Sequence, residues 1–229
     1  LKEAEAVKVT ENSFRNINIA FVNELAKSFD RLGIDVVNVI DGAATKPFSF
    51  LAHYPSCGIG GHCIPVDPYY LIDYAAKNGF NHELLKMACS LNESMPEYTV
   101  ELVENALKKE HKDIFGSKIA LLGLSYKADI DDCRESPSFE IIKILKSKGA
   151  KVVSYDPHVK SLSLAHNLEE AISGSDAVIV ATSHSVFIKE LSPEFIKRLG
   201  VKIIIDGKNC LKRDQFINSD IKYHGIGRQ

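Results

Sequence analysis

One short segment of the chain has the composition of a reactive thiol loop. Cys63 lies in GIGGHCIPVDP (residues 58–68), behind three glycines and ahead of two prolines. Glycine permits backbone angles that other residues avoid and lets the main chain approach a ligand, whereas proline stiffens the segment. A thiolate held in such a loop would be a strong nucleophile. From these residues alone, a glycine-rich turn around a buried, inert cysteine is an equal alternative.

Three further residues could assist such a thiol. Lys8 and Asn12 are four residues apart, so on a helix they share one face. If the thiol loop packs over that face, an ammonium and an amide could hold the oxyanion formed when Cys63 attacks a carbon. Asp67 could orient or deprotonate a water that cleaves the adduct. The alternatives are a solvated polar stripe and a cap for a helix that starts at Pro68.

A metal site in the same region is a weaker hypothesis. His53, Cys57, His62 and Cys63 offer four ligands of the type that zinc prefers. However, His62 and Cys63 are adjacent, which is awkward for one tetrahedral ion, and no spaced cysteine pair is present. We therefore predict no metal site.

The overall composition limits the class of protein. The chain has 229 residues, 45% hydrophobic and 25% charged, with a net charge of −2. This balance argues against a nucleic acid or an anionic membrane as partner, and no apolar run approaches the length of a membrane span. Five cysteines do not form a disulfide framework, so free thiols in a reducing cytoplasm are expected. The charged first residues do not resemble a signal peptide, and the missing initiator Met suggests a start inside a longer protein.

Two textures divide the chain near residue 116. Before it, the pattern predicts helices: one over the first thirty residues ended by Gly33, then helices near 36–40, 69–77 and 83–109, the last kinked at Pro96. A loop from about 43 to 68 carries the thiol motif. The first helix has an apolar stripe with helical spacing, made of Phe14, Ile17, Phe21, Leu25, Phe29 and Leu32.

After residue 116, short apolar strands at 118–124, 151–155, 176–181 and 201–206 alternate with helical segments. Helices start at Ser136-Pro137 and Ser192-Pro193, each with a capping serine before a proline. This alternation is typical of a parallel sheet with helices on both faces. We predict an α/β chain in which an all-helical central domain, residues 1–115, precedes a Rossmann-like, doubly wound parallel-sheet domain, residues 116–229.

A charged loop, Ser125–Glu135, leaves the carboxyl end of the first strand, where ligands of doubly wound sheets bind. It is too long and too poor in glycine for a dinucleotide fingerprint. No G-x-G-x-x-G motif occurs anywhere in the chain. On residue types alone, a solvated surface loop is the favoured interpretation.

Taken together, these segments resemble the UDP-glucose/GDP-mannose dehydrogenase family. The resemblance rests on AEAVKVTENSFRNINIAFVNELA, TKPFSF, YPSCGIGGHCIPVDPYYL and GLSYKADIDDCRESPS, and it covers the middle and C-terminal parts of a family member. The N-terminal NAD-binding domain is absent from this chain. Val66 before Asp67 and His62 before the thiol bring the motif closer to the branch of UDP-N-acetylhexosamine 6-dehydrogenases. The family often has Gly-Pro where this chain has Ser56 and Cys57, and this second thiol is either a spectator or a partner in oxidative inactivation.

The resemblance implies an activity and a role for each residue. Family members oxidise the C6 alcohol of a nucleotide sugar to the carboxylate in two hydride transfers to NAD. Cys63 would attack the aldehyde, and the thiohemiacetal would be oxidised to a thioester that water hydrolyses. Lys8 and Asn12 would stabilise developing oxygen charge, Asp67 would assist the water or the lysine, and the backbone amide of Gly60 would meet the substrate.

By the same resemblance, Lys127 meets the UDP part of the substrate and Arg134 approaches the diphosphate of NAD. The implied partners are a UDP-N-acetylhexosamine and a second copy of the chain, paired through the helical domain. The substrate alternatives are UDP-glucose and UDP-N-acetylmannosamine. Without a cofactor domain we expect this chain alone to be inactive, and a non-catalytic, dimerising UDP-sugar-binding protein is the competing class.

Overall fold

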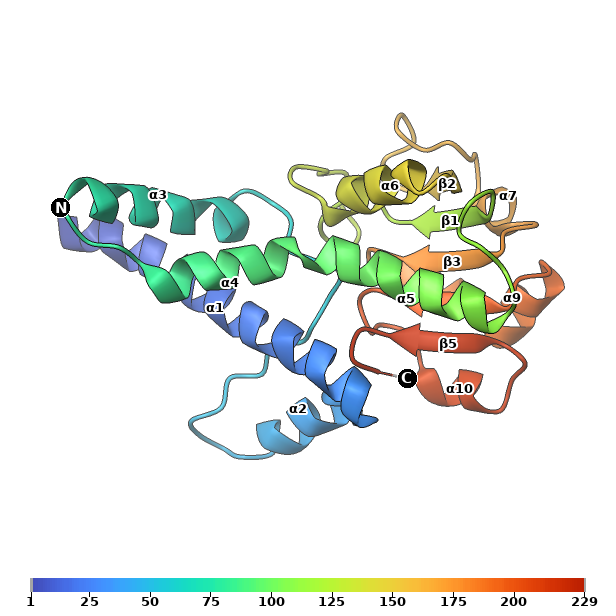
Figure 1. Ribbon diagram of the computed structural model, residues 1–229, viewed down its shortest axis with the longest axis horizontal. Helices are drawn as coiled ribbons and strands as arrows, with labels where there is room; N and C mark the ends of the chain where they lie inside the picture. Colours follow the sequence, from blue (N-terminus) through green and yellow to red (C-terminus); the bar gives the residue numbers. More distant parts are fainter. Residues whose placement is uncertain (1, 229) are drawn as a thin grey trace.

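The computed structural model describes residues 2–228. Helices make up the first half of the chain, and Figure 1 shows that the first four extend away from the sheet while the fifth lies along it. Their bounds are α1 (Lys2–Leu32), α2 (Val36–Ala44), α3 (Cys63–Lys77), α4 (Glu83–Glu93) and α5 (Met95–Lys109). The predicted kink is confirmed, because the long helical segment breaks at Ser94 and Pro96 lies in the first turn of α5.

The second half is a five-stranded, wholly parallel sheet in the order β2-β1-β3-β4-β5. The strands are β1 (Lys118–Leu122), β2 (Lys151–Tyr155), β3 (Ala177–Val180), β4 (Ile203–Asp206) and β5 (Lys222–Gly225). The connecting helices are α6 (Pro137–Ser147), α7 (Leu168–Ile172), α8 (Ser185–Glu190), α9 (Pro193–Arg198) and α10 (Arg213–Ile217). The predicted α/β class, helices first and a Rossmann-like sheet after, is confirmed. The edge strand β5 was not predicted.

Helices cover both faces of the sheet because its central strands are apolar on both sides. On one face, Leu121 and Ile179 pack with Val103 of α5 and Ile141 of α6. On the other face, alternate strand residues such as Leu122 pack with the helices that follow β2, β3 and β4. Since α5 contributes to this core, the last helix of the first half is also a structural layer of the second.

The apolar stripe predicted for α1 is only partly the buried face. Phe14, Phe21 and Leu32 are about half exposed or more. The buried positions are polar or small instead: Asn12, Ser13, Asn16, Ala20, Val22, Asn23 and Ala26. Buried amides are tolerated when they are hydrogen-bonded, and the partners of these asparagines come from α3, α4 and the thiol loop. The interior face of α1 therefore holds other segments through side-chain hydrogen bonds.

The helix that follows the thiol motif begins earlier than predicted. We expected a start at Asp67 or Pro68, but α3 begins at Cys63, so Asp67 lies inside the helix and does not cap it. Pro65 falls in the first turn, where a missing N–H costs nothing. Pro68 leaves the carbonyl of Ile64 without its usual helical donor, and the Nδ2 of Asn16 donates to this oxygen at 3.2 Å. The cross-helix bond thus compensates for the internal proline.

The two halves are joined at several points far apart in sequence. Arg228 donates from Nε to Asp35 at 2.9 Å, with both side chains largely buried. The N–H of Val36 donates to the carbonyl of Gly227 at 2.9 Å, and the N–H of Cys57 donates to the carbonyl of Gly207 at 2.8 Å. Within residues 2–228, no helix has the length and hydropathy needed to cross a bilayer.

Candidate active site

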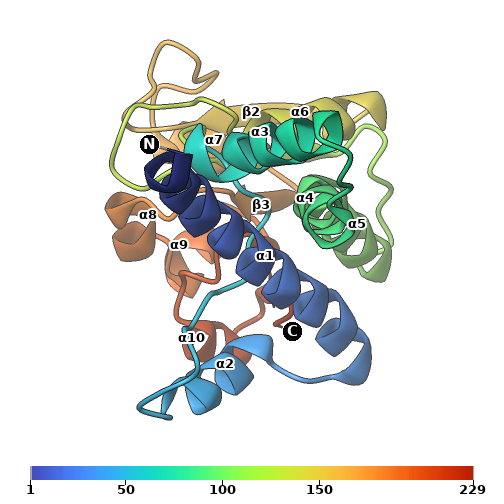
Figure 2. The ribbon, with the colours of Figure 1, turned by 90° about the vertical axis from the view of Figure 1, so that its left-hand side faces the viewer.

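Helices α1 and α3 lie side by side and run in opposite directions (Figures 1 and 2). Asn12, fully buried, donates from Nδ2 to Asp67 Oδ2 at 2.6 Å, and Asn16 bonds Ile64 nearer the start of α3. Asp67 follows Cys63 by one helical turn, so both lie on one side of α3. The structure therefore brings three of the predicted residues, Asn12, Asp67 and Cys63, into one region. The thiol loop does pack over the polar face of α1.

The two thiols of the loop differ in environment. Cys63 is exposed and is the first residue of α3, where the positive end of the helix dipole favours nearby negative charge. Cys57 is completely buried, and its Sγ donates to the carbonyl of Ala181 at 3.5 Å. Burial raises the pKa of the Cys57 thiol, which keeps it protonated. Of these two thiols, only Cys63 is placed to react with a substrate.

The glycines of the loop are required by protein packing. A Cβ on Gly60 would lie 2.5 Å from the Cβ of Tyr126 and 3.0 Å from the carbonyl oxygen of Glu135. Gly61 has a φ of +84°, and a Cβ there would lie 2.8 Å from the Tyr126 ring. The N–H of Gly61 donates to the carbonyl of Arg134 at 2.9 Å. At these two positions the absence of a side chain makes room for the 125–135 loop.

The entry to the thiol loop is anchored as well. The N–H of Ser56 donates to Asn23 Oδ1 at 3.0 Å, and Asn23 donates in turn to Asn92 Oδ1. Together with the Cys57 bond to Gly207, these contacts attach the loop to α1, α4 and the carboxyl edge of the sheet. The position of Cys63 therefore depends on both halves of the chain.

Lys8 stands apart from this group. Its ammonium lies 3.6 Å from Glu11 and its side chain is 59% exposed. Because α1 and α3 run in opposite directions, Lys8 lies one turn beyond Asn12, on the side away from Cys63. Asn12 Oδ1 is buried without a hydrogen-bond partner among the described residues. Such an acceptor costs roughly 1–3 kcal/mol, which a donor supplied by a ligand or by Lys8 would recover.

The 125–135 loop carries the two predicted phosphate-facing cations. Lys127 is exposed, and its backbone carbonyl accepts from Ser125 Oγ at 3.1 Å. Arg134 is paired with Asp132, Nη2 to Oδ2 at 2.6 Å. The Asp132 carboxylate is the main cause that raises the pKa of Arg134, and Cys63 is among the smaller contributors. Both cations thus lie on the loop against which the thiol segment packs.

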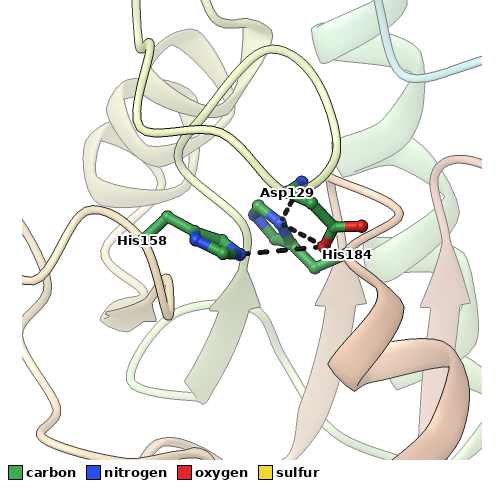
Figure 3. A group of neighbouring side chains, drawn as sticks. All are labelled: Asp129, His158 and His184. Atoms are coloured by element: carbon green, nitrogen blue, oxygen red, sulfur yellow. Dashed lines mark hydrogen bonds and ion pairs between the residues drawn. The ribbon is translucent and has the colours of Figure 1, made fainter.

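A buried pair beneath this loop, Asp156 and His184, was missed by the sequence analysis; Figure 3 shows His184 with its neighbours Asp129 and His158. Asp156, just after β2, and His184, just before α8, are both fully buried. Asp156 Oδ2 accepts from the backbone N–H groups of Leu124 and Ser125, at 2.6 and 2.9 Å, and lies 3.0 Å from His184 Nε2. The sequence signal that could have revealed this pair is Asp156, a charged residue that directly follows the strand β2.

The three residues drawn in Figure 3 have one feature of a metal centre. Asp129, His158 and His184 have ligand atoms within 4.8 Å of one another. However, the N–H of Asp129 donates to His184 Nδ1 at 2.9 Å, so this nitrogen has no lone pair for an ion. The other ring nitrogen of His184, Nε2, carries the proton and faces Asp156. The alternative set of His53, Cys57, His62 and Cys63 forms no such group within the described residues.

A cavity beside the thiol loop has the wrong charge for a diphosphate. Its volume is about 760 Å³, and its walls come from the thiol loop, α3, α4 and the start of α6. The charged residues that line it are Glu93, Glu135 and Glu140, and the described lining contains no lysine or arginine. A nucleotide diphosphate would be repelled there. Lys127 and Arg134 lie on the 125–135 loop and are not among the residues that line this cavity. We therefore expect a diphosphate to bind where these two cations lie and not in this cavity.

Comparison with known proteins matches both halves. Residues 2–94 match the central domain of the UDP-glucose/GDP-mannose dehydrogenase family, and residues 120–213 match its UDP binding domain. UDP-N-acetyl-D-mannosamine dehydrogenase of Pyrococcus horikoshii is 40% identical over 228 residues, which cover 98% of this chain and 52% of that protein. UDP-N-acetyl-D-glucosamine 6-dehydrogenase of Pseudomonas aeruginosa is 35% identical over 223 residues, 94% of this chain and 52% of that protein.

Solved structures agree. The UDP-D-ManNAc dehydrogenase of Pyrococcus horikoshii superposes with a TM-score of 0.90 at 37% identity, over 99% of this chain and 52% of that one. The NDP-N-acetyl-D-galactosaminuronic acid dehydrogenase of Methanosarcina mazei gives 0.91 at 32% identity, over 99% and 51%. The chain therefore spans about half the length of the relatives it matches.

Proposed function

Because this chain belongs to the UDP-glucose/GDP-mannose dehydrogenase family, we propose that it is the catalytic-thiol and UDP-sugar-binding portion of a UDP-N-acetylhexosamine 6-dehydrogenase. The observation that carries the proposal is the contact between α1 and α3, in which Asn12 bonds Asp67 one turn after an exposed Cys63. Relatives named for N-acetylated UDP sugars support the substrate class. UDP-glucose and, within the class, UDP-N-acetylmannosamine are the alternatives to be tested.

In the proposed reaction, the side chains of this chain act on the C6 aldehyde. Cys63 Sγ adds to the carbonyl carbon, and the thiohemiacetal oxygen takes the negative charge or a proton. Asn12 stabilises that oxygen, and Lys8 does so after its exposed ammonium leaves Glu11 and turns toward Asn12. Loss of a hydride from the same carbon gives a thioester. Asp67 assists the water that attacks it, which breaks the C–S bond, releases the carboxylate and restores the thiol.

We propose NAD as the hydride acceptor, held outside the residues of this chain. The carboxyl edge of the sheet, where a doubly wound fold binds a dinucleotide, is filled by the chain itself. Asp156, at the end of β2, is fully engaged by backbone N–H groups and His184. Cys57 covers the edge at β3 and β4, next to Ala181 and Gly207. Among the described residues, Arg134 is the one that the family resemblance places at the cofactor diphosphate, so this chain alone is expected to be inactive.

A binding experiment tests this division of roles. The 229-residue chain should bind UDP at least about tenfold more tightly than NAD, because the charge-assisted bonds of Lys127 are available whereas most of a NAD site is not. Isothermal titration calorimetry with each ligand measures the difference. Lys127→Gln should abolish the preference, and Lys143→Gln, which removes an exposed lysine on α6, should not. Tighter binding of NAD than of UDP would overturn the proposal.

We further propose that the chain forms a homodimer through its helical half. Phe14 and Phe21 on α1 are 49% and 53% exposed, and Leu84 and Met87 on α4 are 65% and 68% exposed. Large apolar side chains concentrated on one part of a surface usually mark an interface. A twofold arrangement would bury two copies of the same patch.

Light scattering tests the dimer. We expect a mass about twice the 25.3 kDa of one chain. Replacing both Phe14 and Phe21 by serine should shift the mass toward that of one chain. Leu164→Ser, which removes an equally exposed side chain from the sheet half, should leave it unchanged. A concentration-independent mass near 25.3 kDa for the unaltered chain would rule out the dimer.

A further inference from the structure

The loop that carries Lys127 and Arg134 is attached to the sheet by three buried side chains, one of which, Thr182, donates to the carbonyl of Ser125 at 2.6 Å. Asp156 holds its beginning, since one carboxylate oxygen accepts from the N–H groups of Leu124 and Ser125. His184 holds its middle, since Nδ1 accepts from the N–H of Asp129 at 2.9 Å. These are the attachments nearest to Lys127 on either side of it along the chain.

The hydrogen bonds leave a single tautomer for His184. A backbone N–H can only donate, so the Nδ1 that receives the Asp129 N–H carries no proton. The proton of the neutral ring is then on Nε2, which donates to Asp156 Oδ2 at 3.0 Å and also lies 3.1 Å from Ser125 Oγ. The imidazole is therefore a link with its donor on the side of Asp156 and its acceptor under the Asp129 N–H. Figure 3 shows the acceptor end.

The backbone at Asp129 is held in an uncommon conformation by this link. Its φ is +59°, a left-handed value that costs energy for a residue with a side chain. The Asp129 carboxylate also accepts from the N–H of Ser185 at 2.9 Å and from its hydroxyl. His184 and Ser185 thus hold the backbone and the side chain of the same loop residue, two positions after Lys127.

The loop in turn supports the thiol segment. The Arg134 carbonyl accepts from the N–H of Gly61, and Tyr126 packs against Gly60 and Gly61. A displacement of the loop would therefore reach both the phosphate-facing lysine and the segment before Cys63. His184 is thus connected, through the 125–135 loop, to the segment that precedes Cys63.

We propose that His184 is a positioning residue for nucleotide binding, in which the Nδ1 acceptor for the Asp129 N–H sets the position of Lys127. The inference rests on the proposed function only in assigning UDP as the ligand of Lys127. Asp156 has other donors, from Leu124, Ser125 and the N–H groups of His158 and Val159. Loss of the imidazole donor therefore leaves the beginning of the loop attached. Loss of the acceptor removes the backbone attachment at Asp129.

Two amide substitutions separate the two ends of the link. The Oδ1 of asparagine occupies the position of Nδ1, so His184→Asn keeps the acceptor for Asp129 and loses the donor to Asp156. The Nε2 of glutamine occupies the position of the imidazole Nε2, so His184→Gln keeps the donor and loses the acceptor. His224→Gln is the matched control, because it replaces another largely buried imidazole, on the edge strand β5.

The measurements are the dissociation constant for UDP, by calorimetry on the 229-residue chain, and the hydrogen exchange of the Asp129 amide, by NMR. We expect His184→Gln to weaken UDP binding at least about tenfold and to expose the amide, and His184→Asn to stay within about threefold with the amide protected. His224→Gln should lower the unfolding temperature without changing either quantity. Equal effects of the two amide substitutions, or none, would overturn the inference.

The two hypotheses fail in different ways. If the unaltered chain does not bind UDP, the proposed function is wrong for Lys127, and the exchange of the Asp129 amide still decides whether His184 positions the loop. If the unaltered chain binds UDP and His184→Gln binds it equally well, the positioning role is wrong and the proposed function stands.

Discussion

Replacing Cys63 with serine should lower acid formation by the proposed full-length dehydrogenase by about a thousandfold or more, because a serine hydroxyl is almost entirely un-ionised at neutral pH. The substitution changes one exposed atom at the start of α3, so the unfolding temperature should not change. The measurement is the rate of uronic acid release from a UDP-N-acetylhexosamine in the presence of NAD.

Cys57→Ser is the matched control for this experiment. It makes the same sulfur-to-oxygen change six residues earlier in the loop, at a buried side chain that donates to the Ala181 carbonyl. A hydroxyl can make the same bond, so acid formation should stay within about threefold of the unaltered enzyme. A Cys63→Ser enzyme that retained more than a tenth of the activity would disprove the covalent route.

Asp156→Asn should destabilise the chain by about 3 kcal/mol or more, because a buried carboxylate that accepts several N–H bonds is replaced by an amide with one oxygen. The NH2 group of the asparagine would face backbone N–H groups that need an acceptor. The measurement is the free energy of unfolding from a urea titration. Asp220→Asn, which alters an exposed carboxylate paired with Lys197, should give no measurable change.

The same carboxylate should make stability depend on pH. Burial pushes the pKa of Asp156 upward, but the bond from His184 and those from backbone N–H groups outweigh it and hold the pKa well below its usual range. A depressed pKa in the folded state means that the stabilisation is complete above the unfolded pKa of about 4 and is lost as the pH falls below it. The unaltered chain should lose more stability than Asp156→Asn between pH 5 and pH 2, taken as approximate limits. Equal losses would contradict this assignment.

The sequence was sufficient to predict the architecture because the signals for it are local. Four strands were recognisable as short apolar runs, and Ser136-Pro137 marked the start of α6 by its capping chemistry. The strand β5 escaped because Lys222, Tyr223, His224 and Gly225 form no apolar run. Because β5 lies at the edge of the sheet, it does not need a continuous apolar run.

The errors concern contacts between residues far apart in sequence. Apolar spacing suggested that Phe14 and Phe21 on α1 face the protein interior. The buried face of α1 instead includes Asn12, Asn16 and Asn23. A buried asparagine is favourable only if a partner exists, and those partners lie 33 to 76 residues away along the chain. No pattern within one helix can reveal them. His184 and Asp156 were missed for the same reason, since each is informative only beside the other.

The bonds that anchor the thiol loop also set the order in which the protein can assemble. Cys57 meets Ala181 across 124 residues, and Asp35 meets Arg228 across 193. Contacts that close such long stretches of chain are formed slowly and late. During synthesis the ribosome must release β3 and β4 before Cys57 can form its bonds to Ala181 and Gly207. The loop that carries Cys63, the proposed nucleophile, thus acquires this support only after Gly207 has emerged, and a shorter nascent chain would carry the thiol without it.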